Sequence, residues 1–435
     1  MLGKGCSLPR QRHSGRMKSA KILSGRKRNA TKLKGYIKLT QNDEEISILM
    51  TMDPLHLSAI DKAKSLLSSA NVLHADCDFG TIKESNAVLD NCFNPARAGG
   101  DLLLNGRSIT TFLDTNIVSG FRRILSQKPG ASLDEQSNCI MSLLLLSAAC
   151  DGQITPGFAL IEMHSTPVGC KYLNESFHAF EYLCAQVDFD DVCDSVLNGI
   201  VPTWRVPVPG IQEEYYVLDN AMRDIPGSQR YKSELFATIS SAIIEKAHGS
   251  DLTQDEKLEI LIKRIHEKGG FALGSLRYFS LYFSDAPANH GIKRGEMMKS
   301  IHSTSKSRVI RGVLNAAADC YFASEYASSL NTHHQRKDPR VFATTDRALQ
   351  LILDREFKDR SLWAGGISTI LANLRGGSMP ERAAEILDAS IPVFDVGHEP
   401  SERPPLREAA QRFLHRQDDV IAEAWDELLS LSSTT

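Results

Sequence analysis

The stretch Thr110-Thr111-Phe112-Leu113-Asp114-Thr115-Asn116 decides how we interpret the rest of the sequence. It begins as a short run of β-branched and aromatic residues, which is typical of a buried parallel strand. Apolar residues at helical spacing follow at once, at Ile117, Val118 and Phe121. Asp114 therefore stands where a strand gives way to a helix, and this pattern predicts an α/β fold.

A second run of the same kind, Val341-Phe342-Ala343-Thr344-Thr345-Asp346, lies far along the chain and is also followed by a helical pattern. In an open α/β sheet, ligands bind outside the carboxyl ends of the strands. If the two strands are neighbours, the carboxylates of Asp114 and Asp346 converge at that edge. An Asp at such a junction is also a good helix N-cap, so capping is the plain alternative for each.

Composition places the chain among ordinary globular proteins and leaves room for more than one domain. It has 435 residues, of which 42% are hydrophobic and 24% charged. The longest apolar run, at 143–150, is too short to cross a membrane. The nine cysteines lack the Cys-x-x-Cys spacing of metal sites, so we expect free thiols in a reducing, cytoplasmic setting.

Charge is distributed unevenly along the sequence. Residues 1–38 hold twelve of the 50 Lys and Arg residues and no acid, so the remainder carries a net charge of −15. An acidic body binds nucleic acid poorly unless local basic residues or metal ions assist. Residues 1–35 are predicted to be a disordered basic arm. The alternatives are an organelle transit peptide, or a true start at Met17 or Met50.

The chain is expected to divide into several segments. Asp53-Pro54 marks the start of a helix that runs to residue 70. A strand is expected at 391–395, where Pro392 favours a sheet edge. The predicted segments are an N-terminal α/β region at 36–104, an α/β core at 105–165 and 307–398, a helical insertion at 166–306 and a C-terminal helix at 399–435.

Two further acids are candidates for the same edge of the sheet. Glu162 lies in a helix that Thr155-Pro156 begins, and it shares a face with Phe158. Asp319 lies in the middle of a strongly periodic helix at 307–330, beside small alanines that leave a carboxylate room to face a cleft. An Asp is intrinsically unfavourable inside a helix. The alternative for each is a solvated surface acid.

The order strand-Asp114, helix-Glu162, helix-Asp319, strand-Asp346 resembles that of PIN-domain nucleases. The resemblance covers about 105–165 and 307–397, in short motifs. It implies a three-layer α/β/α PIN-like core with a central parallel sheet, here with a mainly helical insertion, and metal-dependent phosphodiester hydrolysis, usually of RNA. Glu162 and Asp319 are 157 residues apart, further than in a minimal member of the family. Other acids could therefore replace one of them, namely Glu181, Asp188 or Asp285.

A cluster of carboxylates suits this chemistry. Mg²⁺ and Mn²⁺ prefer oxygen ligands, and gathered carboxylates repel one another until a cation neutralises them. A bound ion lowers the pKa of a water and stabilises charge on the phosphate. We therefore expect a Mg²⁺- or Mn²⁺-dependent endoribonuclease, acting on RNA or single-stranded DNA. Its expected metal ligands are Asp114, Glu162, Asp319 and Asp346, with Asn116 and Thr345 orienting carboxylates or capping helices.

Residues 292–311 are the expected substrate-binding stretch. They hold Lys293, Arg294, Lys299, Lys306, Arg308 and Arg311 against a single acid, and they run into the helix that bears Asp319. We expect Lys293, Arg294, Lys306 and Arg308 to bind backbone phosphates, with Arg122 and Arg123 extending the patch. The alternative is a solvated basic loop, in which case the insertion would serve a protein partner.

Two other functions remain open. One is a phosphatase of the haloacid dehalogenase type with Asp114 as its nucleophile, although that family expects a second Asp where this chain has Asn116. The other is a non-catalytic PIN-like scaffold that binds protein partners.

Overall fold

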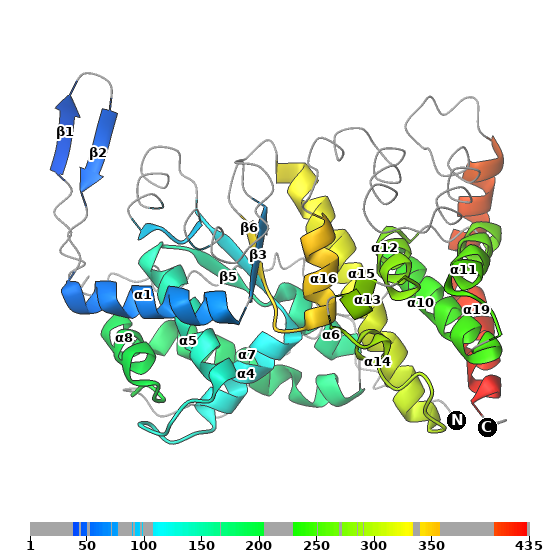
Figure 1. The fold of residues 1–435 in the computed structure, drawn as a ribbon, viewed down its shortest axis with the longest axis horizontal. Helices are drawn as coiled ribbons and strands as arrows, with labels where there is room; N and C mark the ends of the chain where they lie inside the picture. Colours follow the sequence, from blue (N-terminus) through cyan, green and yellow to red (C-terminus); the bar gives the residue numbers. More distant parts are fainter. Residues whose placement is uncertain are drawn as a thin grey trace, which may run out of the picture.

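The chain was analysed as a computed structural model (Figure 1). The 1–35 arm, the strand expected at 391–395 and residue Asp285 lie outside the residues that it describes. The described residues are 38–42, 45–49, 53–70, 72–76, 89, 92–95, 98, 108–165, 167–203, 229–249, 251–268, 272–284, 286–289, 291–333, 340–356 and 404–432.

A four-stranded sheet lies at the centre of the α/β part. Its strand order is β3 (Leu73–Asp76), β6 (Arg340–Ala343), β4 (Thr110–Leu113) and β5 (Gln153–Thr155). Strands β6, β4 and β5 are parallel, but β3 pairs with β6 in the antiparallel direction. The expectation of a wholly parallel sheet is therefore wrong at this edge, where an antiparallel strand is common.

The connections make the β4–β6 boundary special. From β4 the chain moves to β5 on one side, and later returns to β6 on the other side. Such a reversal is a topological switch point, and it opens a crevice at the carboxyl ends of the two strands. Leu113 pairs with Ala343, and the Asp114 N–H donates to the Ala343 carbonyl at 3.0 Å. The two strands are thus neighbours, which meets the condition under which Asp114 and Asp346 converge.

Six helices pack against one another in the α/β body, and α6 contacts β4 of the sheet. Helix α1 contacts α5 and α8, and α7 contacts α4 and α6 (Figure 1). Helices α1, α7 and α8 thus belong to the α/β body with α4, α5 and α6. These helices are α1 (Pro54–Ser69), α4 (Thr115–Leu125), α5 (Glu135–Ala149), α6 (Gly157–Ser165), α7 (Pro167–Gln186) and α8 (Phe189–Asn198).

A helical body forms beside this α/β body. Helix α10 is its centre, since it contacts the other four helices, and the ion pairs Lys232–Asp418 and Arg264–Glu427 join it and α11 to the C-terminal helix. The C-terminal helix therefore packs on the insertion. The five helices are α10 (Gln229–His248), α11 (Gln254–Lys268), α12 (Leu273–Tyr282), α15 (Lys306–His333) and α19 (Pro404–Leu431). Helix α15 agrees closely with the helix expected at 307–330, and α19 lies within the segment expected as the C-terminal helix at 399–435.

The remaining described elements are short or separate. Strands β1 (Lys38–Asn42) and β2 (Glu45–Leu49) form an antiparallel hairpin apart from the four-stranded sheet. Helices α13 (Ala286–Asn289) and α14 (Arg294–Met297) lead towards α15, and α16 (Arg347–Glu356) follows β6. No helix in the described part of the chain is both long and apolar enough to cross a membrane.

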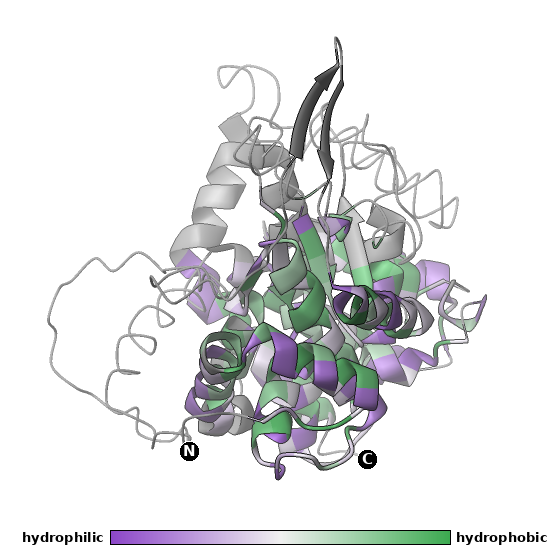
Figure 2. Ribbon diagram, turned by 90° about the vertical axis from the view of Figure 1, so that its left-hand side faces the viewer, coloured by the Kyte–Doolittle hydropathy of each residue, from purple (hydrophilic) through white to green (hydrophobic). Residues whose placement is uncertain are grey.

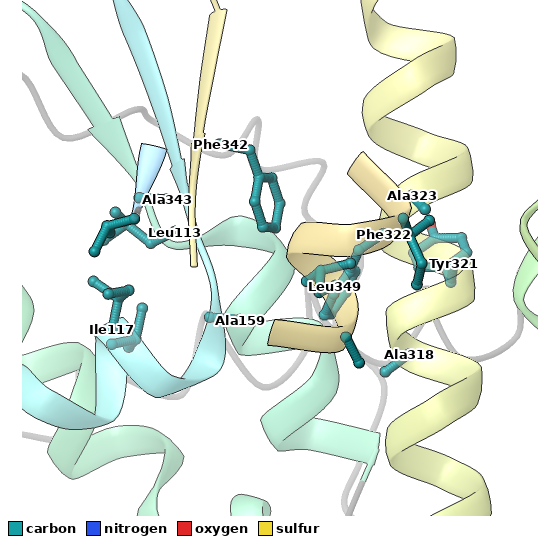
Figure 3. Packing of buried hydrophobic residues seen from close by; sticks show 14 of the residues in the cluster. Leu113, Ile117, Ala159, Ala318, Tyr321, Phe322, Ala323, Phe342, Ala343 and Leu349 are labelled. Carbon is teal, nitrogen blue, oxygen red and sulfur yellow. The ribbon is translucent and has the colours of Figure 1, made fainter. Parts of the chain in front are cut away.

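The buried hydrophobic residues form one core cluster. In the ribbon of Figure 2, green hydrophobic segments lie towards the interior, and purple hydrophilic segments lie on the outer helices. Strand residues alternate between the two faces of the sheet. Leu113, Ala343 and Ile117 of α4 lie on one side of the strands, and Phe342 lies on the other (Figure 3). Six described cysteines are buried free thiols, as the sequence predicted, namely Cys92, Cys139, Cys150, Cys184, Cys193 and Cys320.

Candidate active site

Asp114 lies at the carboxyl end of β4 and caps helix α4. It is 2% exposed, and its Oδ1 accepts the Thr115 N–H at 2.7 Å. Its Oδ2 accepts the Thr344 hydroxyl at 2.8 Å and the Asn116 amide at 3.2 Å. The helix-capping interpretation is therefore correct for Asp114, and the carboxylate is also held against the neighbouring strand end.

Asp346 repeats this arrangement after β6. Its Oδ1 accepts the N–H groups of Ala348 and Leu349 at the start of α16, at 2.8 and 3.3 Å. Its own N–H donates to the Thr344 hydroxyl oxygen at 2.9 Å. One threonine hydroxyl thus contacts both strand-end aspartates, so the two junctions meet at the crevice between β4 and β6.

An aromatic cluster joins the elements that carry all four acids. The Phe158 ring of α6 lies 5.2 Å from Phe112 of β4, 6.0 Å from Phe342 of β6 and 5.5 Å from Phe322 of α15, measured between centroids. Each ring precedes or follows one of the four acids by two to four residues. The packing of Phe158 therefore fixes α6 and α15 against the two strands near their carboxyl ends.

Glu162 and Asp319, both half-buried, extend from these helices towards the same place. Glu162 accepts a hydrogen bond from the hydroxyl of Thr115, the residue next to Asp114. Burial, followed by the negative charges of Asp114 and Asp346, raises the pKa of Glu162 to about 8. Burial raises the pKa of Asp319 well above its ordinary value, and Asp346, Glu162 and Asp114 raise it further.

The pKa of Asp114 is raised to about 6. Burial is the main cause, and the charge of Asp346 adds to it, while the bonds from Thr344, Thr115 and Asn116 work in the opposite direction. The negative charge of Asp346 thus raises the pKa of Asp114, Glu162 and Asp319 alike. The structure brings the four predicted acids into one electrostatically coupled group, which we call the carboxylate cluster (Asp114, Glu162, Asp319 and Asp346).

Lys299 contributes a positive charge that the sequence analysis did not assign to the site. Its Nζ lies 3.0 Å from Asp346 Oδ2. Burial lowers the pKa of Lys299, but Asp346, Asp319 and Glu162 raise it more strongly, so the net shift is upward. The ammonium group therefore neutralises part of the charge of the carboxylate cluster.

The two supporting residues behave differently. Asn116 donates to Asp114, which is the contact expected of a residue that orients this carboxylate. Thr345 was expected to assist Asp346, but the neighbouring Thr344 makes the contacts with both aspartates. The position was misassigned by one residue, because the alternation of a strand does not fix which side chain turns inward after the strand ends.

Arg122 and Arg123 lie in the last turn of α4, at the far end from Asp114. Arg122 pairs with Glu175 of α7 at 3.2 Å and stacks over the Tyr172 ring. Arg123 pairs with Asp134 at 3.1 Å, in the cap of α5. These contacts join helices of the α/β body, so the structure does not bring the two arginines to the carboxylate cluster.

The 292–311 stretch does lie beside the cluster, as the contact between Lys299 and Asp346 requires. The Arg347 side chain at the start of α16 also donates to the Gly291 carbonyl at 3.2 Å. Lys293, Lys306 and Arg308 are exposed, while Arg294 donates to the Ser284 carbonyl at 3.1 Å. Of the basic residues in this stretch, Lys299 is the one that the described contacts bring to the acids, while Lys306 and Arg308 lie at the start of α15, thirteen and eleven residues before Asp319.

The acids that could have replaced Glu162 or Asp319 lie elsewhere where they are described. Glu181 faces Cys184 within α7, and Asp188 stands at the start of α8, which packs on α1 and α5. Among the described residues, no three His, Cys, Asp or Glu side chains are arranged to hold a metal ion directly. Oxygens of Asp114, Glu162 and Asp346 instead accept hydrogen bonds from threonine hydroxyls, backbone N–H groups, Asn116 and Lys299.

Comparisons with protein-family models, with curated proteins and with solved structures give no match to this chain.

Proposed function

We propose that this chain is a metal-dependent nuclease that hydrolyses phosphodiester bonds in RNA. One observation carries the proposal: four carboxylates from four separate elements are electrostatically coupled at a topological switch point. Raised pKa values in such a group mean that the anions are costly without a cation. Helices pack against both faces of β4, which supports a three-layer α/β/α core like that of PIN domains.

All four groups offer carboxylate oxygens, the donor type that a hard divalent cation such as Mg²⁺ or Mn²⁺ prefers, and binding would require them to move into place around the ion, since no three of the described acids hold one as they stand. Asp114 and Asp346 would hold the ion from the strand ends, and Glu162 and Asp319 from the covering helices. When bound, the cation supplies a water of lowered pKa and neutralises charge on the phosphate. Thr344 and Asn116 keep the Asp114 carboxylate oriented towards the crevice.

The exposed cations on the stretch that includes Lys299 support a polynucleotide substrate. Lys293, Lys306 and Arg308 lie on the stretch that contacts Asp346 and the start of α16. Lysine and arginine bind backbone phosphates without reading the bases. A single-stranded nucleic acid could thus run along this stretch, with one phosphate at the acids.

The contacts of Asp114 argue against the phosphatase alternative. A phosphatase of the haloacid dehalogenase type requires a second Asp two residues after the nucleophile, whereas this chain has Asn116, whose amide donates to Asp114 Oδ2 at 3.2 Å. One observation favours the scaffold alternative. Asp346 pairs with Lys299, and no three of the described acids are arranged to hold a metal ion. Metal binding separates the two possibilities.

The test is cleavage of a labelled RNA and of a single-stranded DNA of the same sequence, with Mn²⁺ or with EDTA. The wild-type chain should cleave RNA with Mn²⁺, and Asp114→Asn and Asp346→Asn should each lose at least about 100-fold in rate. Asp134→Asn is the matched control, because Asp134 caps α5 away from the cluster. Equal cleavage by all three variants, or wild-type cleavage that survives EDTA, would refute the proposal.

A further inference from the structure

The backbone of Lys299 packs unusually closely against helix α15, and this contact holds the residue in place. A Cβ atom at Gly312 would lie 1.7 Å from the Lys299 carbonyl oxygen, so only glycine permits this contact. Gly312 precedes Asp319 by seven residues, or about two helical turns, which places the two on the same face of α15. The loop therefore rests on the helix face that presents Asp319.

Two neighbours of Lys299 strengthen this anchoring. The buried Tyr278 hydroxyl of α12 donates to the Met297 carbonyl, two residues earlier. Ser300, the next residue, has a positive φ of 62°, which turns the chain sharply at this point. The backbone is thus fixed on both sides of Lys299, while the long side chain remains able to rotate.

The side chain itself lies at the mouth of the cluster. It is 52% exposed, whereas its partner Asp346 is 14% exposed. A half-exposed ammonium group can exchange its contact with a carboxylate for contact with water or with another anion at small cost. The anchored backbone keeps that ammonium within reach of the acids in either state.

We propose that Lys299 is a built-in counter-ion of the carboxylate cluster, which a divalent cation displaces and which then binds a phosphate of the polynucleotide substrate. This inference rests on the proposed function. A divalent ion and an ammonium group compete for the same carboxylate oxygens, because both neutralise the same negative charge. The displaced ammonium lies beside the ion, where a substrate phosphate brings new negative charge.

The first test measures metal binding without substrate. Mn²⁺ affinity of the full chain is determined by calorimetry at pH 8 for the wild type and for Lys299→Met. Loss of the competing charge should tighten Mn²⁺ binding by about three- to tenfold. Lys299→Arg should restore the wild-type affinity, and Lys263→Met, an exposed lysine of α11, should leave it unchanged.

The second test measures RNA binding. A fluorescent single-stranded RNA is titrated at several salt concentrations, with Ca²⁺ or with EDTA. With Ca²⁺, Lys299→Met should lower the salt slope by about one, the value expected for one lost phosphate contact. With EDTA the slope should match the wild type, because Lys299 then remains with Asp346.

The outcomes separate this inference from the proposed function. Unchanged Mn²⁺ affinity in Lys299→Met would overturn the counter-ion role, and an equal salt slope with Ca²⁺ would overturn the phosphate contact. Tighter Mn²⁺ binding in a chain that cleaves no RNA would support the counter-ion role and refute the nuclease. A wild type and a Lys299→Met variant that both fail to bind Mn²⁺ would refute both.

Discussion

Replacing Asp114 by asparagine should stabilise the metal-free protein at pH 8. The folded-state pKa of Asp114 is about 6, raised from 3.8. An acid whose pKa is higher in the folded state contributes to stability in full when the pH is below its unfolded-state pKa. This contribution is lost as the pH rises through the folded-state pKa. Above pH 7 the ionised Asp114 thus costs the folded state about 3 kcal/mol, since each pKa unit corresponds to about 1.4 kcal/mol.

Asparagine removes that charge but also removes one acceptor. Its amide oxygen can still accept the Thr115 N–H. Its amino group would face the Thr344 hydroxyl, which can turn to accept, and the Asn116 amide, which can flip to present its oxygen. A weakened hydrogen bond of this kind costs about 1 kcal/mol. The net gain in the free energy of unfolding should therefore be about 2 kcal/mol at pH 8. At pH 4.5 the net gain in the free energy of unfolding should be close to zero. Folded Asp114 is then protonated, so removing its carboxylate gains only about 1 kcal/mol, and the weakened hydrogen bond offsets that gain.

The assay is urea unfolding at pH 4.5 and pH 8 in EDTA. The matched control is Asp134→Asn at the cap of α5. Burial opposes ionisation of Asp134, but the Ser137 N–H and hydroxyl and Arg123 hold its pKa below the ordinary value. Its replacement should therefore lower stability at pH 8, by about 1 kcal/mol for a lost cap. If Asp114→Asn is destabilised equally at both pH values, Asp114 is an ordinary cap and the reasoning from the carboxylate cluster fails.

Two further predictions follow from the packing. Gly312→Ala should lower the free energy of unfolding by about 1–3 kcal/mol, because its methyl group must push the Lys299 backbone away from α15; urea unfolding measures this, and an unchanged midpoint would contradict the close approach. Arg123→Ala should leave the salt slope of RNA binding unchanged, because Arg123 is engaged with the cap of α5, whereas Arg308→Ser should lower it by about one. Equal slopes for the two variants would contradict the placement of these two basic residues.

Local sequence signals predicted the helices and the two aspartate strands well. Asp53-Pro54, Asp114 and Thr253 each stand at helix starts, where a side-chain oxygen or a proline fits the open N-terminal turn. Strands β3 and β5 were missed. Leu73-His74-Ala75-Asp76 has no β-branched residue, and Gln153-Ile154-Thr155 is too short to show alternation. Both become strands because they hydrogen-bond to strands already in the sheet, β3 to β6 and β5 to β4.

The site was predictable as far as its residues belong to strand ends or helix faces. The acids could be proposed in this way, but Lys299 could not, since its position depends on a loop that packs against Gly312 of a distant helix segment. The arginines could have been excluded by geometry. Arg122 and Arg123 follow Asp114 by eight and nine residues, so they lie about 12 Å further along the axis of α4.

The pairing of β4 with β6 also determines when the site can form during synthesis. The hydrogen bond between Asp114 and Thr344 joins residues 230 positions apart. At roughly 5–20 residues per second, the ribosome needs about 10–50 s to make that interval. Throughout this time β4 lacks its central neighbour, and the acids of α15 and α16 are not yet beside Asp114. A nascent chain thus carries no assembled carboxylate cluster, and a product that stops before β6 cannot form one.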